Sequence, residues 1–402
     1  MQKLYETAIR PKQVFLIGIR NSRTTKAQAE SNDREIKSLI YTLGLEIAGQ
    51  ELVHVRDRQP KYGMGSGKAM EIAEKAASAA ADCLIFDWEA SPSQQRNWEE
   101  LSGIPAIDRQ ELIIRIFADR AATTEAELQV KLAELEYSLP RLSHKYIDLS
   151  RQRGGHYGTR GSGETKLETD RRNVQQQIHK LEKELEDIKK QRQTRRRQRE
   201  RQGIPICAIV GYTNAGKSSL LKALTGADVL VEDKLFATLD TTTKRFECTP
   251  GLTVLLTDTV GFIRRLPHSL VKAFRSTLEE ATRADLLIHV LDASESDIEN
   301  FYQTTRAVLA ELGAENIPVI TVLNKIDRLE KAVLPPVLPA VEPATPEDSA
   351  HAVQLESLTA RFPGSVITSI KDGTGIAELK QRICAEIRSP RTVTHTDAHT
   401  AE

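Results

Sequence analysis

The segment Gly211-Tyr-Thr-Asn-Ala-Gly-Lys-Ser218 has the residue types and the spacing of a phosphate-binding loop, G-x-x-x-x-G-K-[ST]. Its glycines allow backbone N–H groups to close around phosphate oxygens, and the helix expected to follow adds a favourable dipole. We expect Lys217 to reach the β and γ phosphates of a nucleotide and the Ser218 hydroxyl to bind Mg²⁺. The apolar residues 204–210 predict the strand that must precede such a loop.

A second segment, Asp258-Thr-Val-Gly261, begins 41 residues after Lys217 and follows an apolar stretch. We expect Asp258 to hold the Mg²⁺ shell through water. The N–H of Gly261 is expected to approach the γ phosphate, because glycine has no side chain in the way.

Two further segments predict recognition of the base. Asn324-Lys-Ile-Asp327 ends an apolar stretch, and its Asp327 carboxylate is expected to accept hydrogen bonds from guanine N1–H and from the exocyclic amine. Adenine offers neither group, and an unpaired buried carboxylate is costly, so this position predicts rejection of ATP. Ser369-Ile-Lys371 is expected to close over the base through a backbone N–H, with Ile370 in place of the usual alanine. The motifs together predict binding of GTP and GDP and hydrolysis of GTP.

A threonine between Gly226 and the strand expected at 253 should supply a second Mg²⁺ ligand. Thr238 is the preferred candidate and Thr242 the alternative. The predicted catalytic residues are Lys217, Thr238 and Gly261. The predicted nucleotide contacts are Gly211, Tyr212, Thr213, Asn214, Ala215, Gly216, Lys217, Ser218, Phe236, Ala237, Thr238, Leu239, Asp240, Asp258, Thr259, Val260, Gly261, Asn324, Lys325, Ile326, Asp327, Ser369, Ile370 and Lys371.

Alternating strand and helix patterns predict an α/β protein that positions these residues. In the first part, apolar stretches such as 14–19 and 83–86 read as strands, and polar residues at Ser31 and Asp33 are expected to open a helix that ends near Leu43. The predicted parts are a small parallel α/β domain over 1–115, an antiparallel helical hairpin (a coiled coil) over 116–202, a Ras-like P-loop GTPase domain over 203–388 and a disordered tail over 389–402. A Pro-rich insertion over 334–350 is not expected to form regular structure.

The hairpin prediction depends on apolar residues that repeat with spacings of 4, 3, 4 and 3 in two stretches. The two sets are Leu128, Leu132, Leu135, Leu139 and Leu142, and then Val174, Ile178, Leu181, Leu185 and Ile188. A Gly-rich loop over 143–166 would join the two helices, and a run of eight Lys or Arg residues with one acid follows between Ile188 and Gln202.

Composition narrows the class of protein. The formal net charge is zero over 402 residues, which argues against a uniformly basic nucleic-acid binder but allows local patches. No apolar stretch reaches the roughly 20 residues of a membrane helix, and the N-terminus lacks a signal-peptide pattern, so we expect a cytoplasmic protein without a membrane span. The four cysteines are far apart, and we expect neither a disulfide nor a metal site from them.

The chain resembles GTPases of the HflX family from about residue 14 to residue 388. The specific similarity lies outside the generic motifs, in 91–101, 108–142 and 161–172, and the segments 235–245 and 258–280 also resemble the family. Thr241 stands where proline is usual, the insertion over 334–350 is not a family hallmark, and the extra C-terminal domain of longer members is expected to be absent. The resemblance implies a GTPase that binds the large ribosomal subunit and separates or remodels ribosomal subunits, and we expect a monomer away from the ribosome.

The resemblance also implies roles for single residues. The hairpin loop is the expected RNA contact, through Arg151, Arg153, Arg160 and Lys166. Phe262 occupies the position where many GTPases carry the glutamine that orients the attacking water, so intrinsic hydrolysis should be slow and a partner should supply what is missing. Asn214 lies where potassium-stimulated GTPases bind K⁺; the alternative is an asparagine that only shapes the loop.

Two other readings of the function stay open. The chain could be a GTP-dependent switch whose hairpin docks on a protein without RNA, or an RNA remodeller that also uses ATP. The segment Gly63-Met-Gly-Ser-Gly-Lys68 could form a second nucleotide site or an RNA contact, although its spacing departs from that of the phosphate loop and a plain strand-to-helix turn is the simpler interpretation.

Overall fold

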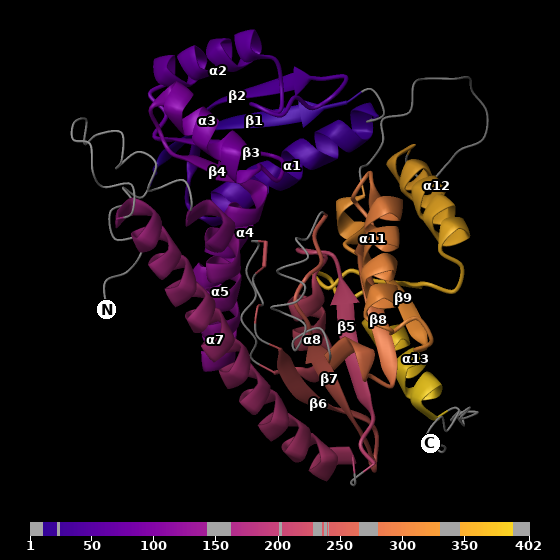
Figure 1. The fold of residues 1–402 in the computed structure, drawn as a ribbon. Coiled ribbons are helices and arrows are strands. Elements are labelled where there is room, and N and C mark those ends of the chain that lie inside the picture. The colour runs from indigo at the N-terminus through magenta and orange to yellow at the C-terminus, as the bar shows by residue number, and fades with distance from the viewer. Residues whose placement is uncertain are drawn as a thin grey trace, which may run out of the picture.

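The computed structural model describes residues 11–21, 25–142, 162–200, 203–227, 235–236, 239, 241–264, 280–329 and 346–388. The predicted fold class is confirmed: a small parallel α/β unit, two long helices and a P-loop GTPase domain follow one another along the chain (Figure 1). Within the described ranges, no helix combines the length and the apolar character needed to cross a membrane.

The N-terminal unit is a four-stranded parallel sheet with the strand order β2-β1-β3-β4 and helices on both faces. Its strands are β1 (Gln13–Arg20), β2 (Glu46–His54), β3 (Cys83–Phe86) and β4 (Ala106–Asp108), and its helices are α1 (Lys26–Thr42), α2 (Ser66–Ser78), α3 (Pro92–Ser102) and α4 (Arg109–Arg120). Side chains of β1 and β3 alternate between two cores, one shared with α1 and α4 and the other with α2 and α3.

Helix α1 begins earlier than the sequence pattern predicts. Thr25 caps it: the Thr25 hydroxyl accepts the N–H of Gln28, and the Gln28 side chain returns to the N–H of Thr25. This reciprocal capping satisfies the backbone N–H groups of Thr25 and Gln28, so the helix begins at Lys26, ahead of the polar residues Ser31 and Asp33.

Two antiparallel helices form the middle of the chain, α5 (Thr124–Ser138), which runs on into the short 3-10 helix η1 (Leu139–Arg141), and α7 (Ser162–Glu200). They lie side by side (Figure 1). Their seam contains eight of the ten residues in the predicted apolar repeats: Leu132, Leu135, Leu139, Leu142, Val174, Ile178, Leu181 and Leu185. The predicted loop over 143–166 lies mostly outside the described residues, and with it Arg151, Arg153 and Arg160; Lys166 belongs to α7, but its side chain is not described.

The GTPase domain is a six-stranded sheet with the order β10-β9-β8-β5-β7-β6, in which only the pairing of β6 with β7 is antiparallel. Its strands are β5 (Ile206–Gly211), β6 (Thr242–Thr249), β7 (Leu252–Asp258), β8 (Leu286–Asp292), β9 (Val319–Asn324) and β10 (Val366–Ile367). Its helices are α8 (Lys217–Thr225), α11 (Ile298–Glu311), the 3-10 helix η2 (Ile326–Arg328), α12 (Pro346–Arg361) and α13 (Ile376–Arg388). Helices α8 and α13 cover one face, whereas α11 covers the other.

One apolar cluster runs from the N-terminal unit into the GTPase domain. It joins Ile36 of α1 and Phe117 of α4 to Phe236 and to Phe301 of α11. The ring of Phe117 meets the ring of Phe236 edge to face, with 4.6 Å between the centroids. A shared core of this kind positions the N-terminal unit against the nucleotide domain.

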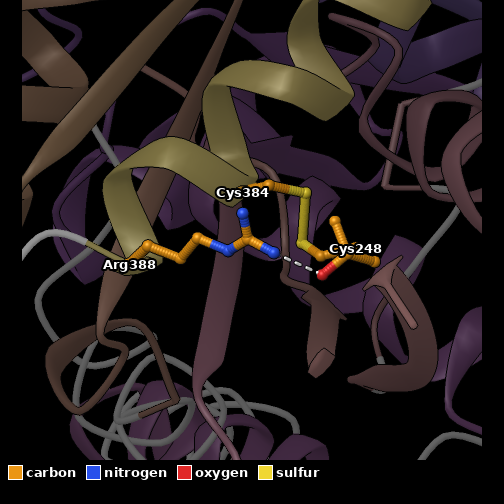
Figure 2. The surroundings of a disulfide bond; sticks show 4 residues. Cys248, Cys384 and Arg388 are labelled. Carbon is orange, nitrogen blue, oxygen red and sulfur yellow. Dashed lines mark hydrogen bonds between the residues drawn. A yellow bond between two sulfur atoms is a disulfide. The ribbon is translucent and has the colours of Figure 1, made fainter. Parts of the chain in front are cut away.

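Two expectations from the sequence are wrong. Pro346 to Ala350, the last part of the Pro-rich segment 334–350, lie in α12; a proline at the first position of a helix loses no hydrogen bond, so proline content alone does not exclude a helix there. Cys248 and Cys384 form a disulfide between β6 and α13, with 5.5 Å between their Cα atoms (Figure 2). The 136 residues that separate them in sequence hide a pairing that only the fold produces.

His289 lies in the middle of β8, fully buried and stacked on Tyr302 of α11 with 5.2 Å between the ring centroids. Neither ring nitrogen has a hydrogen-bond partner within the described chain. Burial, together with the cations of Arg306 and Lys217, lowers the pKa of His289 from 6.5 to about 3. The unfolded chain therefore takes up a proton at this residue below pH 6.5, while the folded chain stays neutral there.

We predict that His289→Leu flattens the pH dependence of stability. Between pH 7.5 and pH 5 the native protein should lose about 2 kcal/mol of unfolding free energy through this group, because the pH falls roughly 1.5 units below the unfolded pKa. Urea unfolding at the two pH values measures this loss. An equal loss in native protein and His289→Leu would contradict the assignment.

Candidate nucleotide-binding site

The phosphate loop connects β5, in the middle of the sheet, with α8. Gly211 has φ of 147°, and a Cβ atom there would lie 2.2 Å from the Val290 carbonyl oxygen. Gly216 has φ of 98°, and a Cβ atom there would lie 2.3 Å from the Asn324 amide nitrogen. Both positions therefore require glycine, because neither the backbone conformation nor the space admits a side chain.

Lys217 begins α8 with its side chain buried, 7% exposed. Its ammonium donates to the Tyr212 carbonyl oxygen at 2.8 Å. Burial lowers the pKa of Lys217 to about 8, and the nearby Asp258 opposes that shift. A Cβ atom on Gly261 would lie 2.8 Å from the Lys217 ammonium, so the two predicted catalytic residues are in contact distance of each other. A buried ammonium at a helix N-terminus fits a polyanion such as a phosphate chain.

The Ser218 hydroxyl donates to an Asp258 carboxylate oxygen at 2.6 Å. Asp258 ends β7 and Ser218 lies in the first turn of α8, so the fold brings together the two predicted Mg²⁺ residues. A hydroxyl and a carboxylate are oxygen ligands of the kind that Mg²⁺ takes, and the donor set fits the ion. Thr242, the alternative threonine, starts β6 directly opposite Asp258. The preferred candidate, Thr238, lies outside the described residues, as do Ala237 and Asp240.

The predicted base-reading segments converge at the ends of β9 and β10. The Asn324 amide donates to the Ala215 carbonyl oxygen at 2.9 Å and so ties this segment to the phosphate loop. The Ser369 hydroxyl donates to an Asp327 carboxylate oxygen at 2.9 Å. Ile370 packs against the core beside α8. The loop that contains Lys371 is closed by a hydrogen bond from the Gly373 N–H to the Ser369 carbonyl oxygen at 2.9 Å.

Lys325 lies between the two ends of the site. Its ammonium donates to the Asn214 carbonyl oxygen at 2.6 Å and forms an ion pair with Asp292 at 2.8 Å. Asn214 has φ of 59°, which glycine and asparagine tolerate best. The Lys325 contact therefore holds the loop at a residue that adopts an unusual backbone conformation.

Phe262, which replaces the usual glutamine, is buried beside the loop. It is 1% exposed, and its backbone N–H donates to the Gly211 carbonyl oxygen at 3.1 Å. Its ring belongs to the core and not to the surface of the site. Among the remaining predicted nucleotide contacts, the buried ones are Thr213, Ala215, Phe236, Leu239, Thr259, Val260 and Ile326.

Tyr212 links the loop to the N-terminal unit, a role that the motif does not predict. Its hydroxyl donates to the Glu35 carboxylate of α1 and accepts the N–H of Arg264 at 2.7 Å. Its ring stacks on Phe301 with 4.0 Å between the centroids. Glu35 in turn is paired with Arg109, which also binds Asp87 at 2.7 Å.

Arg264, three residues after Gly261, makes a second link. Its guanidinium donates to the Asn32 side chain, to the Ser31 hydroxyl at 3.0 Å and to Asp297. The segment that follows the γ-phosphate glycine is thus held from α1. Sequence reasoning missed Arg264, although it falls within the family-like stretch 258–280.

Arg192 links the long helix α7 to the GTPase domain. Its guanidinium donates to Glu125 of α5 and to Glu280, at 2.8 Å in both cases. Glu280 comes directly after residues 265–279, which lie between it and Arg264 in the chain. The helical pair therefore contacts the far end of the segment that Arg264 begins.

The Gly63–Lys68 segment contains no free cation for a phosphate. The Lys68 ammonium binds Glu51 at 2.7 Å and Glu71 at 2.8 Å. Hydrogen bonds from Lys68 and Lys75 lower the pKa of Glu71 to about 2. Gly65 caps α2, so this segment has the geometry of a strand-to-helix connection.

Comparison with known proteins agrees with this geometry. Three family models match the chain: "GTP-binding GTPase N-terminal" over residues 30–118, "GTP-binding GTPase Middle Region" over 120–199 and "50S ribosome-binding GTPase" over 206–325. A GTP-binding protein of Sulfolobus solfataricus, solved in complex with GDP, is similar at 24% identity with a TM-score of 0.46, covering 94% of this chain and 98% of that one.

Closer sequence similarity is found to bacterial proteins named GTPase HflX. That of Akkermansia muciniphila is 44% identical over 400 residues, 96% of this chain and 87% of the relative. That of Escherichia coli is 40% identical over 363 residues, 90% of this chain and 80% of the relative. With a complete phosphate loop and this similarity over nearly its whole length, the chain belongs to the GTPase HflX family and is a GTP-binding enzyme that hydrolyses GTP.

Proposed function

We propose that this GTPase binds the large ribosomal subunit and uses its GTP cycle to separate or remodel ribosomal subunits. The observation that carries the proposal is the match of residues 206–325 to the family of 50S ribosome-binding GTPases. That stretch contains the phosphate loop, Asp258 and Asn324, so the ribosome-related similarity covers the phosphate end of the candidate nucleotide site and the start of its base-reading segment.

In this proposal the phosphate end of the site works by charge and by close approach. The Lys217 ammonium neutralises charge on the β and γ phosphates, and the Gly261 N–H donates to the γ phosphate. Ser218, Asp258 through water, and Thr238 or Thr242 hold Mg²⁺, which polarises the phosphate oxygens when it is bound. The Ser218–Asp258 hydrogen bond of 2.6 Å supports this ligand set.

At the base end, Asp327 reads guanine while Ser369 fixes the orientation of its carboxylate. The 2.9 Å hydrogen bond from the Ser369 hydroxyl holds one carboxylate oxygen of Asp327. Asn324 holds this segment to the phosphate loop through Ala215. This hydrogen bond connects the segment that reads the base with the loop that binds the phosphates.

Hydrolysis in the isolated protein should be slow. The buried Phe262 ring cannot orient a water molecule, so positive charge and backbone donors act alone. We propose that the ribosome supplies the missing contact. For Asn214, two roles stay open: its side-chain oxygen binds K⁺ beside the phosphates, or the residue only gives the loop its left-handed turn.

The hairpin is the proposed RNA contact. Arg151, Arg153 and Arg160 precede the first residue of α7 in the chain, and Lys166 lies near that first residue, toward the end of the helix opposite to Arg192. From residue 166 to residue 192 a helix extends roughly 40 Å, enough for a narrow basic loop to enter a cleft in folded RNA. The ion pair between Arg192 and Glu280 connects α7 to the GTPase domain, at a point that follows Gly261 and Arg264 in the chain.

The GTP form should lower the light scattering of intact ribosomes as subunits separate, whereas the GDP form should not. Lys217→Ala should lose this activity at least 100-fold, because it removes the charge that holds the phosphates. Lys222→Ala, on the exposed side of the same helix α8, is the matched control and should behave as the native protein. Unchanged scattering with GTP bound would count against the proposal.

The alternative function, a GTP-dependent switch that docks on a protein, is distinguished by the salt dependence of binding to large subunits. Replacing Arg151, Arg153 and Arg160 together by Gln should reduce the slope of log affinity for large subunits against log salt by roughly 2 to 3. The control variant removes the same charge from the shaft of α7, at Lys180, Lys183 and Lys190. A slope that is shallow in the native protein and unaffected by either variant would favour the protein partner.

Asp327→Asn should change the base that the site accepts. The amide has one acceptor oxygen, so when that oxygen accepts from N1–H its NH₂ group faces the guanine amine, donor against donor, whereas it can donate to the 2-oxo group of xanthine. We expect affinity for guanine nucleotides to fall roughly 100-fold or more and affinity for xanthine nucleotides to rise. Titration with fluorescent nucleotides measures both, and Glu378→Gln on the surface of α13 controls for the lost charge. Retained guanine preference would show that Asp327 does not read the base.

A further inference from the structure

The disulfide between Cys248 and Cys384 has no part in the nucleotide chemistry described above. Cys248 lies near the end of β6, where the ladder with β7 is irregular: Glu247 pairs with Thr253 and Thr249 with Leu252. Cys248 is therefore the extra residue of a β-bulge, and bulges turn a side chain away from its regular direction. The sulfur points to Cys384 on α13 (Figure 2).

The bridge lies in an open groove of about 530 Å³ between β6 and α13, to which both cysteines contribute. A groove of this size takes a small molecule. Its lining carries three cations, Arg245, Lys380 and Arg388, against one acid, Glu247. The Arg388 guanidinium lies beside the bridge and donates to the Thr249 hydroxyl at 2.5 Å (Figure 2). The groove therefore has the charge to attract an anion.

The other two cysteines do not share this setting. Cys83 and Cys207 are buried in β3 and β5 with 1% and no exposure. Burial raises the pKa of the Cys83 thiol to about 12, which keeps it from forming a thiolate at neutral pH. Thiol chemistry in the described chain is thus directed to the groove.

We propose that Cys248–Cys384 is a thiol–disulfide exchange site, opened and closed by an anionic low-molecular-weight thiol that docks in the cationic groove. The thiolate attacks the sulfur of Cys248, which is more exposed than that of Cys384, and Cys384 leaves as a thiolate that takes up a proton. A second thiolate attacks the mixed disulfide and releases Cys248. Two thiols give one disulfide, and their two electrons and two protons pass to the cysteine pair; the reverse sequence closes it.

The bridge joins elements that lead away from opposite ends of the nucleotide site. Strand β6 starts at Thr242, opposite Asp258, and α13 starts directly after the loop that contains Ser369. Among the strands that the structure describes, β6 is at the edge of the sheet and pairs with β7. Closing the bridge fastens this edge strand to α13, and opening it leaves the strand held by β7 and by packing.

The first test measures how fast different thiols open the bridge in the full-length oxidised protein. The probes are glutathione, an anion, 2-mercaptoethanol, which is neutral, and cysteamine, a cation, each normalised to its rate with a solvent-exposed reference disulfide. We expect glutathione to react about tenfold faster than the neutral thiol at low salt, with the preference lost at about 0.5 M salt. Equal normalised rates, or four titratable thiols in the protein as purified under oxidising conditions, would overturn the proposal.

Variants of the groove provide the control. Lys380→Gln with Arg388→Gln should remove the preference for glutathione and leave the rate with 2-mercaptoethanol within about twofold. Arg382→Gln lies on the same helix, paired with Glu386 and outside the groove, and should keep the preference. The preference surviving in the double variant would exclude the groove as the docking site.

The second test measures whether the disulfide stabilises the protein by fastening β6 to α13, and it needs no groove variant. Reduction of the native protein should lower the melting temperature by roughly 10 °C, because a cross-link over a long loop constrains the unfolded chain. Cys248→Ser should melt at the temperature of the reduced native protein and should no longer respond to thiols. A melting temperature of the native protein that does not depend on redox state would overturn the proposal that the disulfide fastens β6 to α13.

Discussion

The buried ammonium of Lys217 is the constraint around which the site is built. A cation with 7% exposure is costly unless negative charge compensates it; Asp258 supplies part of that charge, while the positive dipole end at the N-terminus of α8 adds to the demand for an anion. Gly211, Gly216 and Gly261 leave no room for side chains in the same space. The polyanion of a nucleotide satisfies this arrangement, and the central position of β5 in the sheet makes the arrangement rigid.

Changes at the phosphates reach the rest of the molecule through few contacts. The Tyr212 hydroxyl joins the phosphate loop to Glu35 of α1 by a hydrogen bond. The Arg264 guanidinium joins the segment after Gly261 to Asn32 on the same helix. Arg192 of α7 joins the helical pair to the GTPase domain through a hydrogen bond to Glu280. Because these contacts converge on the two ends of residues 265–279, a change of nucleotide can alter how the N-terminal unit and the hairpin are held. This is the physical basis for the proposed action on the ribosome.

Local motifs in the chain were sufficient to predict the fold class and the nucleotide segments. The phosphate loop is defined by its own glycines, Lys217 and Ser218 in a fixed order, and Asp327 belongs to a short segment at the end of a strand. The residues that bind the nucleotide could therefore be recognised from their local spacing alone. The apolar repeats likewise contained most of the α5–α7 seam. Whether Thr238 is the Mg²⁺ ligand and whether Arg151, Arg153 and Arg160 meet RNA stay predictions.

Features that depend on long-range packing could not be predicted. The Cys248–Cys384 pair spans 136 residues, and the Tyr212–Glu35 contact joins two separate domains. Neither has a periodicity or a motif, because each arises only when two folded surfaces meet. The start of α1 was missed for a smaller reason: the capping box at Thr25 and Gln28 lies ahead of Ser31 and Asp33, the polar residues from which the helix start was predicted.

The rate of GTP hydrolysis with and without purified large ribosomal subunits, in K⁺ and in Na⁺, tests the central claim most directly. The account predicts slow turnover by the protein alone, at least a tenfold increase with subunits, and no turnover in Lys217→Ala under either condition. Loss of the increase in Na⁺ would assign Asn214 to K⁺ binding, and an equal increase in both salts would leave it a loop-shaping residue. No stimulation in either salt, with GTP binding intact, would contradict the ribosomal role.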